Sequence, residues 1–563
     1  MSASRLFHTL RWLPPGQLAA LVRQRVKTLV ERRERFAARP APAFPGVRWS
    51  PAHARSPHAR YDAARLRAGE FTFLNRSEPL GWPPRWNDAA LPLLWTYNLH
   101  YFEYLDSLAY EDGRALILDW IARHPLARGN PGWEPYPTSL RLFAWCAWLF
   151  GRERARTESD RELCAAAWPS IWLQAEWLAT HFETHLRANH LLENAAALAY
   201  CGACFAGPGD AWLAQGTACL DRELAEQMLA DGLHFERSPM YHARIVHVLE
   251  ALAVTGVPAL ARRVAERLER ARSALARLCH PDGEIALLND AAFGIAPRPG
   301  DWLAPAPDGA FALPDAGYFG ARASGHYLVC DAAPIGPDYQ PGHAHGDLLS
   351  FELSLRGQRV VVDAGVHGYD GDPLRAWCRS TTAHNTVEID AADQCEFWST
   401  FRVGRRARPH EVEFVERPDG FSLSAWHDGY ERLDGRPRHA RAFRWYDEGV
   451  LLVRDRVTAS GPVAAISRVH LHPACTIEEV SGLRARIRHP GGVCAVVFDG
   501  DGALAVEAST YCPEFGVRHD ARALAFRAGE RTTEFGFCIA DGDGEVAYQS
   551  DAGAQVKGRR FPW

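Results

Sequence analysis

The sequence lacks any long, uninterrupted apolar segment. No stretch approaches the roughly 20 apolar residues that a membrane-spanning helix needs. Arginines recur throughout Met1 to Phe36, and Leu18 to Val22 is too short for the apolar centre of a secretory signal, which needs roughly 7–15 residues. We therefore expect no membrane span and no signal peptide. A cytoplasmic location is the prediction, with a periplasmic one less favoured.

The chain also lacks a strong charge of either sign and a regular cysteine framework. A formal net charge of -5 in 563 residues argues against nucleic-acid binding as the main activity. The thirteen cysteines are odd in number and scattered, which fits a reducing compartment and a role as small buried residues. A hydrophobic share of 47% and a charged share of 23% are those of a globular protein. The length requires more than one core.

The spacing of apolar residues changes once along the chain. From about residue 60 to 295 it follows a helical period, with short turns between successive antiparallel helices. From about 317 onward it alternates with period two, as in Phe351, Leu353 and Leu355, which predicts antiparallel strands of a sandwich. We predict an α+β multidomain protein: a helical arm and linker at 1–59, a helical domain at 60–300 and a β-sandwich at 301–563.

The N-terminal arm carries a basic amphipathic helix, expected at 16–36. Such a helix could touch an anionic membrane surface or a partner, but a plain solvated helix is the favoured interpretation. The Pro-rich segment Arg39 to Pro45 is then typical of a linker.

Three histidines and an aspartate form the most informative pattern. His343 and His345 share one face of an extended chain, Asp363 ends an apolar run, and His384 precedes another. Two imidazoles and one carboxylate from three expected strands match a ligand set that zinc accepts. We predict one divalent metal, zinc rather than calcium, on His345, Asp363 and His384. His343 would remain for chemistry, although any one histidine could equally be a hydrogen-bonded core residue.

The helical half has polar groups at two expected helix starts. Asn189 and His190 open an apolar helix, although this pair could be only a cap and a core histidine. Ser238 is a natural N-cap before Pro239, which places Tyr241 in the first turn. There the helix dipole stabilises a phenolate or a bound anion.

In this order, these segments resemble the heparinase II/III-like polysaccharide lyase family. The similarity rests on Trp95–Phe102, Trp133–Arg141, Asn189–His190, Ser238–His242, His343–Asp347 and Ala383–Val387. The fold that the resemblance implies is an incomplete (α/α) toroid joined to antiparallel β-sheets, with the active site in the groove between them.

The resemblance also implies an activity, cleavage of uronic-acid-containing polysaccharides by β-elimination. Tyr241 and His343 match the family's catalytic tyrosine and histidine, and Asn189, alone or with His190, would neutralise the uronate carboxylate. The metal would mainly stabilise the structure of the groove. We expect the substrate to be an acidic bacterial capsule or exopolysaccharide, with an aminohexuronate polymer as one candidate. Its expected contacts are Tyr97, Asn98, His100, Trp133, Tyr136, Arg141, Glu236 and Arg379.

Two other functions stay open at this point. One is a non-catalytic polysaccharide-binding or assembly protein on the same scaffold. The other is a metal-dependent hydrolase that uses a zinc-bound water, although no His-Glu-x-x-His motif supports it. The stereochemistry is open too: Tyr241 alone could serve a gluco-configured uronate, whereas Tyr241 with His343 or His190 is favoured for a galacto-configured one.

Overall fold

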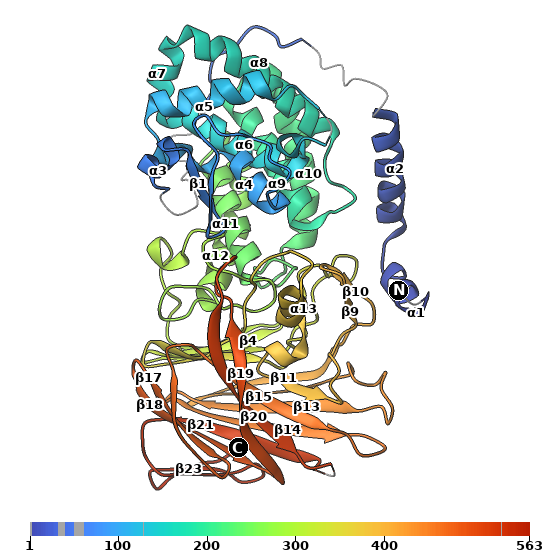
Figure 1. Cartoon of the computed structure of the whole chain (residues 1–563), viewed down its shortest axis with the longest axis vertical. Helices are drawn as coiled ribbons and strands as arrows, with labels where there is room; N and C mark the ends of the chain where they lie inside the picture. The colour runs from blue at the N-terminus through green and yellow to red at the C-terminus, as the bar shows by residue number, and fades with distance from the viewer. Residues whose placement is uncertain (1–2, 32–39, 50–60, 128, 531) are drawn as a thin grey trace.

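The computed structural model describes residues 3–31, 40–49, 61–127, 129–530 and 532–563. Figure 1 shows helices at one end of an elongated molecule and sheets at the other, with loops between them. The predicted fold class, a helical N-terminal part followed by an antiparallel β-sandwich, is confirmed. The exact domain limits at residues 60 and 300 stay predictions.

The helical part packs its helices around a core rich in aromatic residues. Trp120, Trp145 and Trp148 are fully buried in it, so most tryptophans fill the core. Its helices are α3 (Ala63–Arg67), α4 (Leu93–Tyr101), α5 (Tyr110–Arg123), α6 (Pro135–Ala147), α7 (Arg154–Ser159), α8 (Arg161–Thr180), α9 (Ala188–Cys204), α10 (Pro208–Gln227), α11 (Pro239–Ala253) and α12 (Pro258–Arg277). A short hairpin, β1 (Glu70–Phe73) and β2 (Arg76–Pro79), precedes α4.

Two large antiparallel sheets form the sandwich. Phe351 on one sheet contacts Phe443 and Phe537 on the other, with ring centroids 6.0 Å apart in both pairs. The first sheet contains β11 (Pro409–Arg417), β12 (Gly420–His427), β13 (Arg438–Tyr446), β14 (Val450–Thr458), β21 (Glu534–Asp541), β18 (Gly492–Asp499), β17 (Arg484–His489) and β16 (Thr476–Ser481), in that order. The burial pattern alternates along β12 and most of β13, as the period-two spacing predicts.

The second sheet lies nearer the helices and supports the site. It contains β19 (Gly502–Tyr511), β20 (His519–Ala528), β15 (Ala465–Leu471), β7 (Gln358–Val361), β6 (Phe351–Leu355), β5 (His326–Asp331), β4 (Tyr318–Ala323) and β3 (Gly309–Leu313), with β8 (Val387–Ile389) paired to β15. Smaller elements are β9 (Phe397–Trp398), β10 (Arg402–Val403), β22 (Val546–Gln549), β23 (Gly553–Val556), β24 (Arg559–Phe561) and helix α13 (Pro373–Arg379).

Two expected elements differ in detail. The helical spacing expected between residues 60 and 295 is interrupted at Phe102, which has a φ of 63°, so α4 ends there and a 3-10 turn, Glu103–Ser107, follows. The segment around His343 and His345 is a loop between β5 and β6, not a strand. The two side chains nevertheless converge, because both bond the carboxylate of Asp290.

The N-terminal arm consists of α1 (Ala3–Leu10) and α2 (Pro15–Glu31) and runs along one side of the molecule (Figure 1). The helix expected at 16–36 thus corresponds to α2, and residues 32–36 lie outside the described part, as does Arg39 of the expected linker. Within the described residues, no helix is both long and apolar enough to cross a membrane.

Candidate active site

Tyr241 stands at the start of α11, as the Ser-Pro pair predicts. The hydroxyl of Ser238 caps the helix by accepting a hydrogen bond from the Tyr241 amide at 3.2 Å. The Tyr241 ring packs on the His343 imidazole, with centroids 4.1 Å apart, and its hydroxyl lies 2.9 Å from that of Tyr369. Burial, followed by the charge of Asp290, raises the pKa of Tyr241. The phenol therefore keeps its proton at neutral pH.

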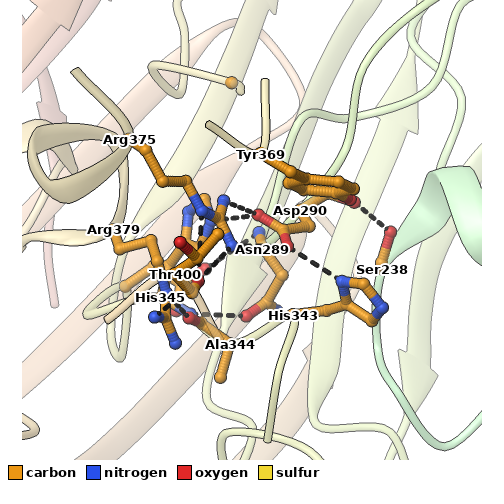
Figure 2. A network of polar contacts seen from close by, with 12 residues as sticks. Ser238, Asn289, Asp290, His343, Ala344, His345, Tyr369, Arg375, Arg379 and Thr400 are labelled. Carbon is orange, nitrogen blue, oxygen red and sulfur yellow. Dashed lines mark hydrogen bonds and ion pairs between the residues drawn. The ribbon is translucent and has the colours of Figure 1, made fainter. Parts of the chain in front are cut away.

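A buried aspartate, Asp290, is the centre of the site (Figure 2). It accepts hydrogen bonds from Nδ1 of His343 and Nε2 of His345, both at 2.8 Å. Arg375 donates to both of its oxygens, one of them at 2.8 Å. Burial alone would raise the pKa of Asp290, but Arg375 and the two histidines hold it well below its usual range. The carboxylate is therefore ionised.

This contact determines the chemistry of His343. An ionised Asp290 accepts from Nδ1–H, so the Nε2 atom carries the free electron pair. The His343 side chain is 12% exposed, and Nε2 lies 3.7 Å from Oε2 of Glu236. His343 can therefore take up a proton at Nε2, next to a tyrosine that can give one.

The start of α9 approaches His343 through Glu236, which lies between His343 and Asn189. Nδ1 of His190 lies 3.2 Å from Oε1 of Glu183, and its ring lies 4.5 Å from that of Tyr136. The Asn189 amide donates to Glu236 at 3.3 Å. Burial by itself lowers the pKa of His190, but Glu183 outweighs it, so the net shift is upward. His190 thus tends to carry a positive charge that a uronate would meet.

Glu236 lies between these two histidines and is buried. Its Oε2 atom has no hydrogen-bond partner among the described residues. Burial raises the pKa of Glu236, against the opposing charges of His343 and His190. This environment favours the protonated form of Glu236 more than water does.

The three predicted metal ligands come together. One side-chain donor atom from each of His345, Asp363 and His384 lies within 4.8 Å of the others. All three side chains are fully buried. Nδ1 of His345 and Nε2 of His384 have no partner among the residues described. Burial lowers the pKa of His345 to about 3, so this imidazole is neutral and its lone pair is available.

The donor set fits a divalent metal. Two imidazole nitrogens and one carboxylate oxygen suit zinc better than calcium. Nδ1 of His384 lies 2.7 Å from Asp363. Nε2 of His345 lies 2.8 Å from Asp290, and a carboxylate on the second nitrogen of a metal-binding histidine typically fixes the orientation of its ring. Asp363 follows β7 and His384 precedes β8, while His345 comes from a loop, so the expectation of three strands is wrong for His345.

Four of the expected substrate contacts lie in the core. His100 accepts from the Trp120 indole at 3.0 Å, and Arg141 donates to Gln174 at 2.8 Å. Trp133 is 3% exposed. Arg379 is also buried and donates to backbone oxygens of residues 344, 399 and 400. Because these side chains are buried and bonded inside the fold, the structure does not present them to a substrate.

Three of the other expected contacts are only partly buried, whereas Glu236 is buried. Tyr97 and Asn98 lie on one turn of α4, and Tyr136 opens α6. Tyr136 donates to Glu193 at 2.7 Å, and Arg244 binds the other oxygen of Glu193 at 3.1 Å. Tyr136 borders His190, and the role of these residues in binding stays a prediction.

The sequence interpretation missed Asp290, Arg375, Tyr369 and Glu183. Asp290 follows Asn289 directly after the apolar run 285–288, which was the one local signal for it. The partners of Asp290 are 53, 55 and 85 residues away, so spacing alone could not identify the network.

Comparison with known proteins agrees with this geometry. Residues 118–295 match the family model for the heparinase II/III N-terminus, and residues 305–541 match that for the heparinase II/III-like C-terminal region. A heparin-sulfate lyase of Pedobacter heparinus is 27% identical over 383 residues, which cover 60% of this chain and 54% of that protein. A second heparin-sulfate lyase, from Bacteroides stercoris, is 23% identical over 49% of this chain and 44% of that protein. The chain spans about half the length of these curated relatives.

Solved structures show the same fold. A crystal structure of heparinase III superposes with a TM-score of 0.71 at 14% identity, over 100% of this chain and 99% of that one. A mutant of the heparan sulfate lyase HepC from Pedobacter heparinus gives 0.62 at 20% identity, over 89% and 88%. With both family regions matched in order, the chain belongs to the heparinase II/III-like family.

Proposed function

We propose that the protein is a polysaccharide lyase that cleaves a uronic-acid-containing polymer by β-elimination. The observation that carries this proposal is the contact between Tyr241 and His343, whose rings lie 4.1 Å apart. One is a protonated phenol, and the other presents a free Nε2 because Asp290 occupies Nδ1. A proton acceptor beside a proton donor is the pair that β-elimination requires.

The reaction follows from these groups. His343 takes the proton from C5 of the uronate, the C4–O4 bond breaks as the C4–C5 double bond forms, and Tyr241 gives its proton to the departing O4. No water is consumed, and the new chain end is a 4,5-unsaturated uronate. Asn189, the cationic His190 and a protonated Glu236 would neutralise the carboxylate at C6, which lowers the energy of the enolate-like intermediate.

The short distance between the two rings bears on stereochemistry. A sugar ring cannot fit between Tyr241 and His343 at a centroid separation of 4.1 Å, so both act from one side. That suits a gluco-configured uronate, in which H5 and O4 are on the same side. A galacto-configured substrate needs groups on both sides, and His190, which lies against Tyr136, is then the candidate partner of Tyr241.

We further propose that zinc, bound by His345, Asp363 and His384, braces the site. When bound, the metal would supply a positive charge that ties the loop of His345 to the strands of the second sheet. All three ligand residues are fully buried. A metal-activated water for hydrolysis would have to reach a substrate, and this burial disfavours such a reaction.

The substrate that we propose is an acidic bacterial capsule or exopolysaccharide, acted on in the cytoplasm. The named relatives are heparin-sulfate lyases, so glucuronate-containing glycosaminoglycans belong in the same trial. The protein should be incubated with gluco-configured, galacto-configured and amino-substituted uronate polymers while the absorbance of unsaturated uronate is followed in the ultraviolet. Chain cleavage without this absorbance would indicate a hydrolase, and binding without cleavage would indicate an assembly protein.

A further inference from the structure

The N-terminal arm exposes large apolar side chains to an unusual degree. Phe7 is 62% exposed and Val22 is 64% exposed. Of the fourteen exposed large apolar residues in the described chain, six lie between residues 6 and 26. They are Leu6, Phe7, Leu10, Leu18, Val22 and Val26. A plain solvated helix, the interpretation that the sequence favoured, does not explain this concentration.

These side chains form a stripe on α2 with basic residues on both sides. Leu18, Val22 and Val26 are spaced by four and therefore share one face of the helix. At 3.6 residues per turn, Arg23 and Arg25 fall on either side of that stripe, and both are exposed. An apolar stripe between two basic borders is the pattern of a helix that lies in a membrane interface.

The inner face of the arm is attached to the body of the protein. Gln17 is 4% exposed and donates to the backbone oxygen of His185 at 3.4 Å. On α1, the Trp398 indole donates to the Thr9 hydroxyl at 3.2 Å, and Arg406 donates to the backbone oxygen of His8 at 3.2 Å. The inner contacts are therefore made within the chain. At 3.6 residues per turn, the stripe of Leu18, Val22 and Val26 lies on the side of α2 away from the buried Gln17.

The charge of the arm is opposite to that of the whole chain. Residues 1–31 contain five Lys or Arg and one acidic residue, Glu31, whereas the full chain has a net charge of -5. A second copy of this chain would present the same basic surface and be repelled. A soluble acidic polymer would pair with the arginines but leave the apolar stripe in water. An anionic lipid surface satisfies both features.

We propose that the outer face of α1 and α2 binds to an anionic membrane surface, without crossing it. The apolar side chains enter the interface and the arginines contact lipid phosphates. The arm also contacts the β9–β10 segment, where Phe401 lies 6.1 Å from His343 between ring centroids. Binding would therefore hold the groove close to the membrane, where a membrane-associated polymer would be presented.

Vesicle sedimentation tests this proposal with the full chain. Wild type should sediment with vesicles of equal parts phosphatidylcholine and phosphatidylglycerol, but not with phosphatidylcholine alone. Val22→Asp should abolish sedimentation, and Arg23→Gln with Arg25→Gln should weaken it by about fivefold per arginine. Val506→Asp, at a valine that is 42% exposed on β19, is the matched control and should bind as wild type does.

Several outcomes would overturn the proposal. They are no binding by wild type, equal binding to neutral vesicles, and unchanged binding by Val22→Asp. If light scattering showed a wild-type dimer that Val22→Asp converts to a monomer, without vesicle binding, the face would be a contact between copies instead. Because no step depends on turnover, the result is independent of the proposed lyase activity.

Discussion

Nδ1 of His343 lies 2.8 Å from Oδ2 of the buried Asp290. This contact selects the tautomer in which Nε2 of His343 is the proton acceptor. Arg375 keeps Asp290 ionised, so the orientation is maintained whether or not a substrate is bound.

Asp290→Asn should therefore lower kcat by about 10²–10⁴-fold with a smaller change in KM. The amide cannot accept from His343 and Arg375 as a carboxylate does, so Nε2 is no longer reliably free. Leaving Arg375 without its partner should also lower the unfolding free energy, by about 3–5 kcal/mol. Kinetics and thermal melting must be measured together. If the folded variant kept its kcat, Asp290 would be structural only.

Tyr241→Phe should reduce turnover by about 10²–10⁴-fold while the fold and polymer binding persist. The matched control is Tyr369→Phe, which removes only the hydroxyl 2.9 Å from that of Tyr241. We expect this control to lose much less activity. Equal losses in both variants would mean that the proton donor is not assigned to the right tyrosine.

The losses of activity in His343→Ala and His190→Ala should depend on the configuration of the substrate. On a gluco-configured polymer, His343→Ala should be as inactive as Tyr241→Phe, whereas His190→Ala should keep part of its activity. On a galacto-configured polymer, His190→Ala should be inactive as well. Initial rates of both variants on both polymers distinguish these mechanisms. Wild-type rates for both variants on the gluco-configured polymer would leave Tyr241 acting alone.

Elemental analysis of purified protein should find one divalent metal per chain, with zinc expected. His384→Ala should lose that metal and melt at a lower temperature, because the ion joins loop and strands. His427→Ala changes a histidine that is also fully buried but bonded to His439 at 3.1 Å. This control should melt earlier too, yet keep the metal. Metal-free wild type, after purification without chelators, would contradict the prediction.

The pH profile should depend on Glu183. Its contact with His190 raises the pKa of that imidazole, so the charged form is present below the raised pKa and is lost as pH rises through it. The activity of wild type should thus fall on the alkaline side above the ordinary histidine range. In Glu183→Gln this fall should occur at lower pH.

Glu250→Gln serves as the control for Glu183→Gln. Glu250 pairs with Arg272 at 2.7 Å and has no contact with His190. Its profile should coincide with that of wild type. A Glu183→Gln profile that also coincides would show that His190 is not the group that titrates.

The sequence by itself determined the features that depend on near neighbours. The Ser238-Pro239 pair starts α11 and places Tyr241 in its first turn, because an N-cap and a fixed proline φ act within a few residues. The period of the apolar residues likewise predicted helices first and strands later. The order of the motifs predicted the family, and the spacing of His345, Asp363 and His384 predicted that they meet.

Only the tertiary structure decided which polar side chains meet around Asp290. Arg141 and Arg379 look like substrate contacts in the sequence, but packing buries them against protein oxygens. Asp290 looks unremarkable, yet it joins His343, His345 and Arg375 from distant segments. The physical reason is that burial and hydrogen-bond partners are set by contacts far apart in the chain, whereas helix starts and strand periods are set by residues close together.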